Sequence, residues 1–91
     1  MAGESEDRRR QLLRAAYEVA APKRGPSASV HLHEVAKEMG LKDPGRDEDV
    51  RDELTSMVLD LQEEGDVEGW SPTNARFRLT SQGASKVEGA E

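Results

Sequence analysis

The sequence contains no cysteine and no isoleucine, and it has one tryptophan, one tyrosine and one phenylalanine in 91 residues. Without cysteine there is no disulfide framework and no thiolate metal site. This composition fits a reducing compartment, so we expect a cytoplasmic protein. Leucine, valine and phenylalanine supply 16 residues, just under the roughly one-fifth level at which disorder becomes a serious alternative. The chain therefore forms at most one small domain with a thin core, and homodimer formation stays open as a way to bury more surface.

Long hydrophobic runs are also lacking. No stretch approaches the roughly 20 apolar residues of a membrane-spanning helix, and no apolar run precedes residues 8–10, so we expect neither a membrane segment nor a secretory signal. Glycine-rich phosphate loops, nucleophile elbows and zinc-protease motifs are missing. We therefore expect no enzyme, no catalytic residues and no cofactor. His31 and His33 have no spaced third ligand, and they predict helix capping and surface exposure instead of a metal site.

Negative charge is abundant but unevenly distributed. The net charge is −6, yet residues 46–68 carry two basic and ten acidic side chains, whereas the segments before and after each carry a net charge of +1. The basic residues near the start are expected to pair with carboxylates of the same segment. The two sets are Arg8, Arg9, Arg10 and Arg14, and Glu4, Glu6, Asp7 and Glu18.

The clearest pattern is a helical stripe within the acidic region. Apolar residues recur there at spacings of three and four, which is one face of an amphipathic helix. They are Val50, Leu54, Met57, Val58 and Leu61. Acidic residues at 47–49 favour a helix start, and Gly65 with Asp66 ends the pattern near residue 64. The sequence thus predicts a helix of roughly 25 Å, at about 1.5 Å per residue, with an acidic outer face.

Two further helices precede this stripe. Apolar residues at helical spacing predict a helix over residues 6–20, which Pro22 helps to end. A second helix is predicted over residues 32–39, with His31 near its N-cap. A short strand at residues 28–30 fits between the two helices.

A hairpin and a short final helix follow the stripe. Residues 67–80 predict two strands around a turn at 71–74, with Trp70 and Phe77 packed toward the core. A helix weakened by an internal glycine is expected over residues 82–87. The expected extents of the single domain and of its two disordered ends are residues 5–87, 1–4 and 88–91.

Three segments carry a family resemblance. They are residues 31–41 (HLHEVAKEMGL), similar to the helix that opens the motif, residues 61–67 (LQEEGDV), similar to a recognition helix running into a wing, and residues 77–83 (FRLTSQG), similar to the strand that closes the wing. Over about residues 8–87 the chain resembles the winged helix-turn-helix superfamily of bacterial and archaeal regulators. The resemblance implies an α+β fold with three main helices, a wing of two or three strands and a short C-terminal helix.

The same resemblance implies duplex DNA binding, commonly by a dimer and often in transcription control. The third helix then enters the major groove and the wing contacts phosphate or the minor groove. Arginines 76 and 78 alternate with apolar residues and share one face of the wing strand, which suits phosphate contact. The candidate DNA-binding residues are Arg46, Arg51, Thr55, Arg76 and Arg78. Surface charge that serves only solubility explains the wing arginines equally well.

The charge of the third helix favours a different interpretation. Its face opposite the apolar stripe is acidic, and carboxylates repel DNA phosphates. A basic protein partner fits an acidic face with an apolar centre. The candidate partner-binding residues are Glu48, Asp52, Leu59 and Glu63. A solvated face without any partner also explains them. The family resemblance therefore predicts a DNA-binding regulator, and the charge of the third helix leaves a protein-interaction module as the alternative.

Overall fold

The structure, a computed structural model, describes residues 2–89 of the chain. Its helices are α1 (Ala2–Ala20), α2 (Leu32–Glu38), α3 (Glu48–Glu64) and α4 (Ser81–Gly89), and its strands are β1 (Val30–His31), β2 (Val67–Ser71) and β3 (Arg76–Leu79). This order of helix, strand, helix, helix, hairpin and final helix confirms the predicted sequence of elements. The expected disorder of the chain ends concerns, in part, residues 1, 90 and 91, which lie outside the described residues.

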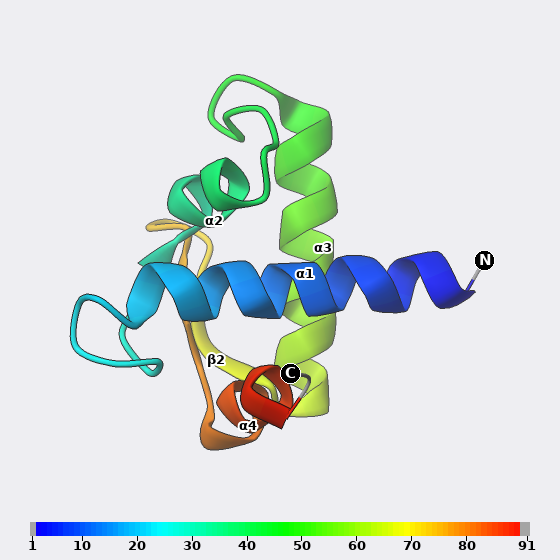
Figure 1. The fold of residues 1–91 in the computed structure, drawn as a ribbon. Coiled ribbons are helices and arrows are strands. Elements are labelled where there is room, and N and C mark those ends of the chain that lie inside the picture. The colour runs from blue at the N-terminus through cyan, green and yellow to red at the C-terminus, as the bar shows by residue number, and fades with distance from the viewer. Residues whose placement is uncertain (1, 90–91) are drawn as a thin grey trace.

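Helix α1 is the central element of this α+β fold. Figure 1 shows α1 crossing in front of α3 at a steep angle, with α2 above α1 and α4 below it in this view. The same helix contacts α2, α3, α4, β1 and β3. The buried apolar side chains lie where these elements meet, and they are Leu12, Leu13, Ala15, Ala16, Ala20, Val30, Leu32, Val35, Ala36, Leu54, Met57, Val58, Leu61, Val67, Phe77 and Leu79.

Helix α3 begins and ends as the sequence predicts. The Asp47 carboxylate caps it by accepting hydrogen bonds from the backbone N–H groups of Asp49 at 3.0 Å and Val50 at 3.2 Å. Gly65 ends it with a φ of 89°, a left-handed conformation that glycine adopts without strain. The predicted stripe is buried, with Val50 only half-buried. The opposite side of α3 is therefore fixed as its outer surface.

The three strands form one antiparallel sheet in the order β1, β3, β2. Val30 faces Phe77 across the first pair, and Val67 faces Leu79 across the second. These four side chains are buried against the helices. Because side chains alternate along a strand, both arginines of β3 lie on the sheet face turned away from the core, as expected from their spacing.

Several element boundaries differ from those predicted. Helix α1 begins at Ala2 instead of residue 6, because alanine and glutamate near its start favour helix. Strand β1 begins two residues later than predicted, since the Ala28 N–H closes a turn onto the Gly25 carbonyl at 3.0 Å. Ala75 belongs to the hairpin turn and not to β3, with a φ of 51°. Each shift reflects local turn geometry that residue type alone specifies weakly.

The glycine inside α4 has a packing role that the sequence did not predict. The predicted final helix is present and extends on both sides of Gly83. Gly83 is buried, and a Cβ atom at this position would lie 2.0 Å from the carbonyl oxygen of Asp66. Glycine is therefore what allows α4 to approach the corner between α3 and β2.

A helix that spans a bilayer is about 20 residues long and predominantly apolar. None of the helices within residues 2–89 is long and apolar enough to cross a membrane.

Candidate interaction surface on α3

The exposed side of α3 is rich in carboxylates. Seven exposed residues form what we call the α3 outer face, and they are Glu48, Asp49, Asp52, Ser56, Leu59, Asp60 and Glu63. The 3.6-residue period of the helix places all of them opposite the buried stripe. Leu59 is 46% exposed, and it is the one exposed large hydrophobic side chain among the described residues. The predicted position of Leu59 on the outer side of the helix is confirmed.

Few of these carboxylates are neutralised within the molecule. Glu48 lies 3.8 Å from Arg51, but its side chain is 86% exposed, so the pair contributes little. Within the described part of the chain, none of the other four outer-face carboxylates forms an ion pair. The α3 outer face thus concentrates negative charge around one apolar side chain.

One edge of α3 is neutralised by helix α1. Arg8 forms an ion pair with Glu53, and Arg9 lies 3.4 Å from Glu64. These arginines were expected to pair within the first helix; the described carboxylates that they contact belong to α3 instead, because α1 crosses α3 at this point (Figure 1). Arg14 does pair within α1, with Glu18 at 3.4 Å. The side chains of the other expected partners at positions 4 and 6 lie outside the described residues.

The opposite edge of α3 meets the hairpin. The Gln62 side-chain oxygen accepts a hydrogen bond from the Trp70 backbone N–H at 3.1 Å. Arg51 and Thr55 lie on this edge too, since their helical positions match that of Gln62. Thr55 is half-buried and Arg51 is exposed. The α3 outer face is therefore bordered by α1 on one side and by β2 on the other.

The five DNA-binding candidates come from three parts of the fold. Arg51 and Thr55 lie on the α3 edge that carries Gln62, whereas Arg76 and Arg78 lie on the sheet face turned away from the core. Arg78 forms an ion pair with Glu68 across the hairpin, with 3.1 Å between Nε and Oε1, which offsets its charge. Arg46 is exposed in the connection before α3.

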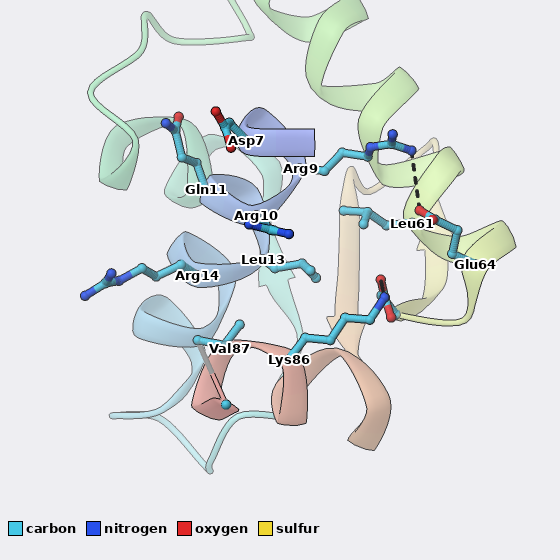
Figure 2. A pocket seen from close by; sticks show the side chains of 12 residues that line it. Asp7, Arg9, Arg10, Gln11, Leu13, Arg14, Leu61, Glu64, Lys86 and Val87 are labelled. Carbon is cyan, nitrogen blue, oxygen red and sulfur yellow. Dashed lines mark hydrogen bonds and ion pairs between the residues drawn. The ribbon is translucent and has the colours of Figure 1, made fainter. Parts of the chain in front are cut away.

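An open groove of about 940 Å³ lies between α1 and α4 (Figure 2). Leu13, Leu61 and Val87 contribute apolar side chains to it, and charged side chains of both signs surround them. The charged residues are Asp7, Arg9, Arg10, Arg14, Glu64, Asp66 and Lys86. Because four cations are opposed by three carboxylates, the groove offers no strong selection for an ion of either sign.

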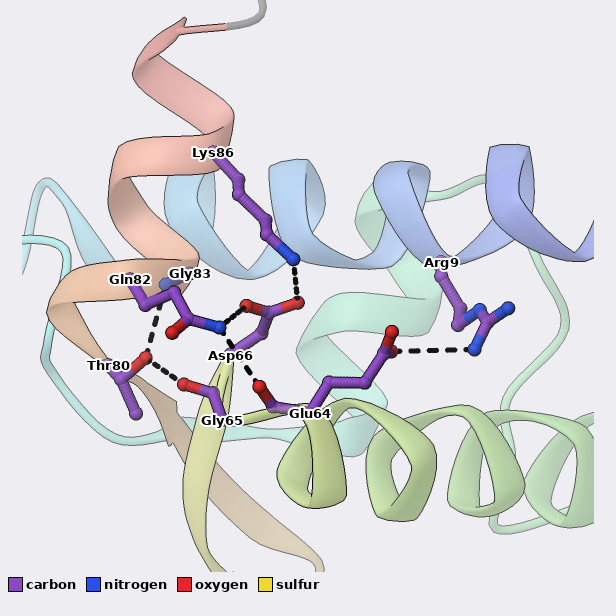
Figure 3. A network of polar contacts seen from close by, with 8 residues as sticks. All are labelled: Arg9, Glu64, Gly65, Asp66, Thr80, Gln82, Gly83 and Lys86. Atoms are coloured by element: carbon purple, nitrogen blue, oxygen red, sulfur yellow. Dashed lines mark hydrogen bonds and ion pairs between the residues drawn. The ribbon is translucent and has the colours of Figure 1, made fainter.

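Sequence reasoning missed a buried carboxylate beside this groove. Asp66 is 1% exposed, and its oxygens accept hydrogen bonds from Gln82 Nε2 at 2.8 Å and Lys86 Nζ at 2.9 Å (Figure 3). Gln82 also donates to the Glu64 carbonyl at 2.9 Å, while the Thr80 hydroxyl accepts from the Gly83 N–H at 3.1 Å. These contacts link α4 to the end of α3. Its one signal in the sequence is the spacing of Gln82 and Lys86, which puts both on one helix face.

Both histidines stabilise the start of α2, as the sequence predicts for His31. The His31 Nδ1 accepts the His33 N–H at 3.0 Å, and the His31 N–H donates to Glu34 Oε1 at 3.0 Å, forming a capping box. The pKa of Glu34 is lowered, chiefly by the hydrogen bond from the Lys23 ammonium and further by that from His31, although burial raises it. His33 Nδ1 lies 3.2 Å from Asp43. These contacts give both histidines structural partners.

The pKa of Asp43 is also lowered, first by a hydrogen bond from the Gly45 N–H and then by its contact with His33. The Gly45 N–H lies 2.8 Å from the Asp43 carboxylate. This contact stabilises the connection between α2 and α3 in the orientation that sets the start of α3.

Comparisons with protein-family models, with curated proteins and with solved structures found no match to this chain. Functional inference therefore rests on the α3 outer face and its surroundings.

Proposed function

We propose that the chain is a non-enzymatic winged helix-turn-helix module that binds a basic protein partner through the α3 outer face. The fold supports the first half of this proposal. A helix, a short strand and two helices precede a hairpin, and the strand between the first helices joins the hairpin as the edge of a three-stranded sheet. This is the layout that the sequence resemblance implies, with α3 in the place of the recognition helix and β2–β3 as the wing.

The charge of α3 carries the second half of the proposal. The outer face holds five carboxylates and no basic residue. A helix entering the major groove would bring these carboxylates close to phosphates, and phosphate neutralisation supplies much of the affinity for DNA. A surface rich in lysine and arginine has the opposite charge and gains association rate and orientation from the same field.

The apolar centre of the face adds a second favourable feature. Leu59 is surrounded by charged neighbours, and protein interfaces typically combine a desolvated apolar centre with a polar rim. A single exposed leucine is common on monomers, so the combination with uncompensated charge matters more than the exposure alone. In this proposal Glu48, Asp52 and Glu63 accelerate association, whereas Leu59 contributes contact area.

Duplex DNA is the second candidate ligand, and one observation favours it. Within the described residues, neither Arg46 nor Arg76 forms an ion pair with a carboxylate. Both guanidinium groups are exposed and open to phosphates. In this alternative, binding occurs through the wing and the connection before α3, with α3 turned away from the duplex.

A backbone amide chemical-shift titration at low salt separates the two functions. We expect a lysine- and arginine-rich peptide to shift signals across residues 48–63, and a short generic duplex to leave these signals unchanged. The double variant Asp52→Lys/Asp60→Lys should abolish the peptide response, while Glu38→Lys on α2 controls for a reversal of charge away from α3. Chemical-shift changes with DNA that are confined to Arg46 and the wing, together with no response to the peptide, would show that the ligand is DNA and not a basic protein.

A further inference from the structure

The hairpin contains an irregularity beside α3. Glu68 faces Arg78 and Ser71 faces Arg76, so two residues of β2, Gly69 and Trp70, stand opposite one residue of β3. This is a β-bulge, which bends the strand and redirects its side chains. Gly69 has a φ of 70°, a conformation that favours glycine. The bulge is thus specified by the sequence at this position.

The bulge changes the direction of the only tryptophan. Strict alternation from the buried Val67 and the exposed Glu68 would place Trp70 on the exposed face of the sheet. Instead, the Trp70 ring lies on the core side, with its centroid 6.4 Å from that of Phe77. Unlike Phe77, which is buried, Trp70 is only half-buried. The chain therefore presents part of an indole ring next to α3.

Trp70 and Leu59 both have Gln62 as a neighbour. The Trp70 backbone is hydrogen-bonded to Gln62, and Gln62 lies one helical turn beyond Leu59 on α3. Moving around α3 from β2 toward α1, the helical period places Glu48 first, then Leu59, then Asp52 and Glu63, and finally Asp60. Carboxylates thus lie on both sides of Leu59.

This arrangement matches one kind of partner. A basic amphipathic helix lying along α3 can place an apolar stripe against Leu59 and Trp70 and its lysines or arginines beside that stripe, facing the carboxylates. Asp52 and Glu63 are about three helical turns apart at 1.5 Å per residue, so a short helix reaches both. Tryptophan is enriched among residues that dominate binding energy, because its large rigid ring buries much area.

We infer that Trp70 and Leu59 are the apolar anchor of the α3 outer face, and that its partner is an amphipathic helix with basic residues beside its apolar stripe. This inference rests on the proposed function. It adds a binding residue on the hairpin, and it identifies the bulge as the feature that places that residue beside α3.

Because Trp70 is the only tryptophan, its fluorescence reports on the anchor directly. The probe is a helical peptide without tryptophan or tyrosine, with leucines at i, i+3, i+4 and i+7 and arginines along one flank. Its control has the same composition in scrambled order. We expect the patterned peptide to shift Trp70 emission to shorter wavelength, since burial removes water from the indole, and the scrambled peptide to leave the emission unchanged.

Affinity is measured separately by anisotropy of the labelled peptide. Leu59→Ala and Trp70→Ala should each weaken binding of the patterned peptide by about tenfold or more. Trp70→Phe retains an aromatic ring against Phe77 and should lose less affinity, and circular dichroism verifies that each variant is folded. Glu38→Lys should bind as the wild type does.

The outcomes distinguish this inference from the proposed function. If both peptides bind equally and Asp52→Lys/Asp60→Lys removes binding, but Trp70 emission is unchanged, the acidic face binds basic partners and the anchor is wrong. If neither peptide binds at low salt, the anchor and the proposed function are both wrong. Equal affinity of wild type and Trp70→Phe/Leu59→Ala for the patterned peptide would also overturn the anchor.

Discussion

Carboxylates on α3 and just beyond its end occur in two contrasting settings. At the corner between α3 and β2, Asp66 is buried, and its oxygens accept hydrogen bonds from Gln82 and Lys86. On the outer face, Asp52 and Asp60 are exposed and have no ion pair within the described residues. A buried charge is tolerated only when it is paired and hydrogen-bonded, so the first setting serves the fold. The second adds nothing evident to folding stability and is open to a ligand.

The difference separates two uses of the same residue type. A carboxylate that stabilises the fold is surrounded by donors from distant parts of the chain, and here those donors come from α4 (Figure 3). A carboxylate available for binding keeps its acceptors free, and repulsion among such neighbours slightly opposes folding. Substitutions should therefore affect stability at the corner and binding at the outer face.

The largest expected effect tests which side of α3 faces the core. Leu54→Ala and Leu61→Ala should each reduce the free energy of unfolding by about 2–5 kcal/mol, because both side chains are buried and leave a cavity. Leu59→Ala should reduce the free energy of unfolding far less, since Leu59 is 46% exposed. Urea denaturation midpoints measure all three. Similar losses for the three variants would indicate that a second copy of the chain buries Leu59.

The next effect concerns the contact between α4 and the corner. Gly83→Ala should destabilise the fold by about 1–3 kcal/mol, because its new Cβ atom would collide with the Asp66 carbonyl oxygen. Gly89→Ala in the same helix is the matched control, since nothing lies within 4 Å of a Cβ at that position. The melting temperatures of both variants, compared with that of the wild type, test this expectation. Equal melting temperatures would mean that α4 does not pack tightly on the corner.

Loss of a single donor to Asp66 should be smaller. Lys86→Met removes the ion pair and leaves Gln82 as the side-chain donor to a buried carboxylate, with an expected loss of about 1 kcal/mol because the lysine is half exposed. Lys37→Met, at an exposed position of α2, controls for the loss of a positive charge. Chemical denaturation at moderate salt compares them. A Lys86→Met variant as stable as Lys37→Met would make the Asp66 pair energetically unimportant.

Glu34 is an intermediate case, half-buried and hydrogen-bonded to Lys23 and to the His31 N–H. Its pKa is lowered in the folded state, so its contribution to stability is present above its ordinary pKa of 4.5 and is lost as the pH falls through the folded value. Glu34→Gln should therefore reduce the free energy of unfolding at neutral pH and have little effect in acid.

A pH series of denaturant titrations on both proteins measures this difference. Glu38 provides the control of opposite sign, because the hydrogen bond between its protonated carboxyl and the Glu18 carboxylate raises the pKa of Glu38. Glu38→Gln should increase the free energy of unfolding most at neutral pH and least in acid. If the difference between wild type and Glu34→Gln does not change with pH, the capping contacts do not depend on the ionised carboxylate.

The smallest stability effect is expected on the outer face. Asp60→Lys should change the free energy of unfolding by no more than about 0.5 kcal/mol, as exposed substitutions usually do. If it changes stability at all, the variant should be more stable, because one of several neighbouring negative charges is removed. Denaturant midpoints at low salt provide the measurement. A large loss would show that Asp60 has a structural partner and would remove it from the interaction surface.

Local patterns predicted most of the fold. The apolar stripe of α3 depends on helical periodicity and on two end signals, Asp47 and Gly65, all of which lie within one segment. The same pattern predicted correctly that Leu59 faces outward. The alternation along β3 likewise located the buried Phe77 between two exposed arginines.

Features that depend on distant residues were not predicted. Arg9 pairs with Glu64 across 55 positions, and only the crossing of two helices explains this choice over nearer carboxylates. The burial of Asp66 depends on donors from α4, and the need for glycine at position 83 depends on how closely that helix approaches. The placement of Trp70 on the core side was predicted, but the β-bulge that produces it depends on the pairing register of β2 with β3. Sequence periodicity contains no information about such tertiary contacts.

The dependence of Asp66 on α4 has a consequence for synthesis of the chain on the ribosome. Until residues 81–89 have emerged, the Asp66 carboxylate has neither of its side-chain donors. The surface of α1 that contacts α4 in the complete fold is also uncovered until then. We therefore expect the nascent domain to stay protease-sensitive until α4 is released from the exit tunnel. Completion of the fold would then coincide with completion of this helix, and a message truncated before codon 81 would yield a product that cellular proteases degrade rapidly.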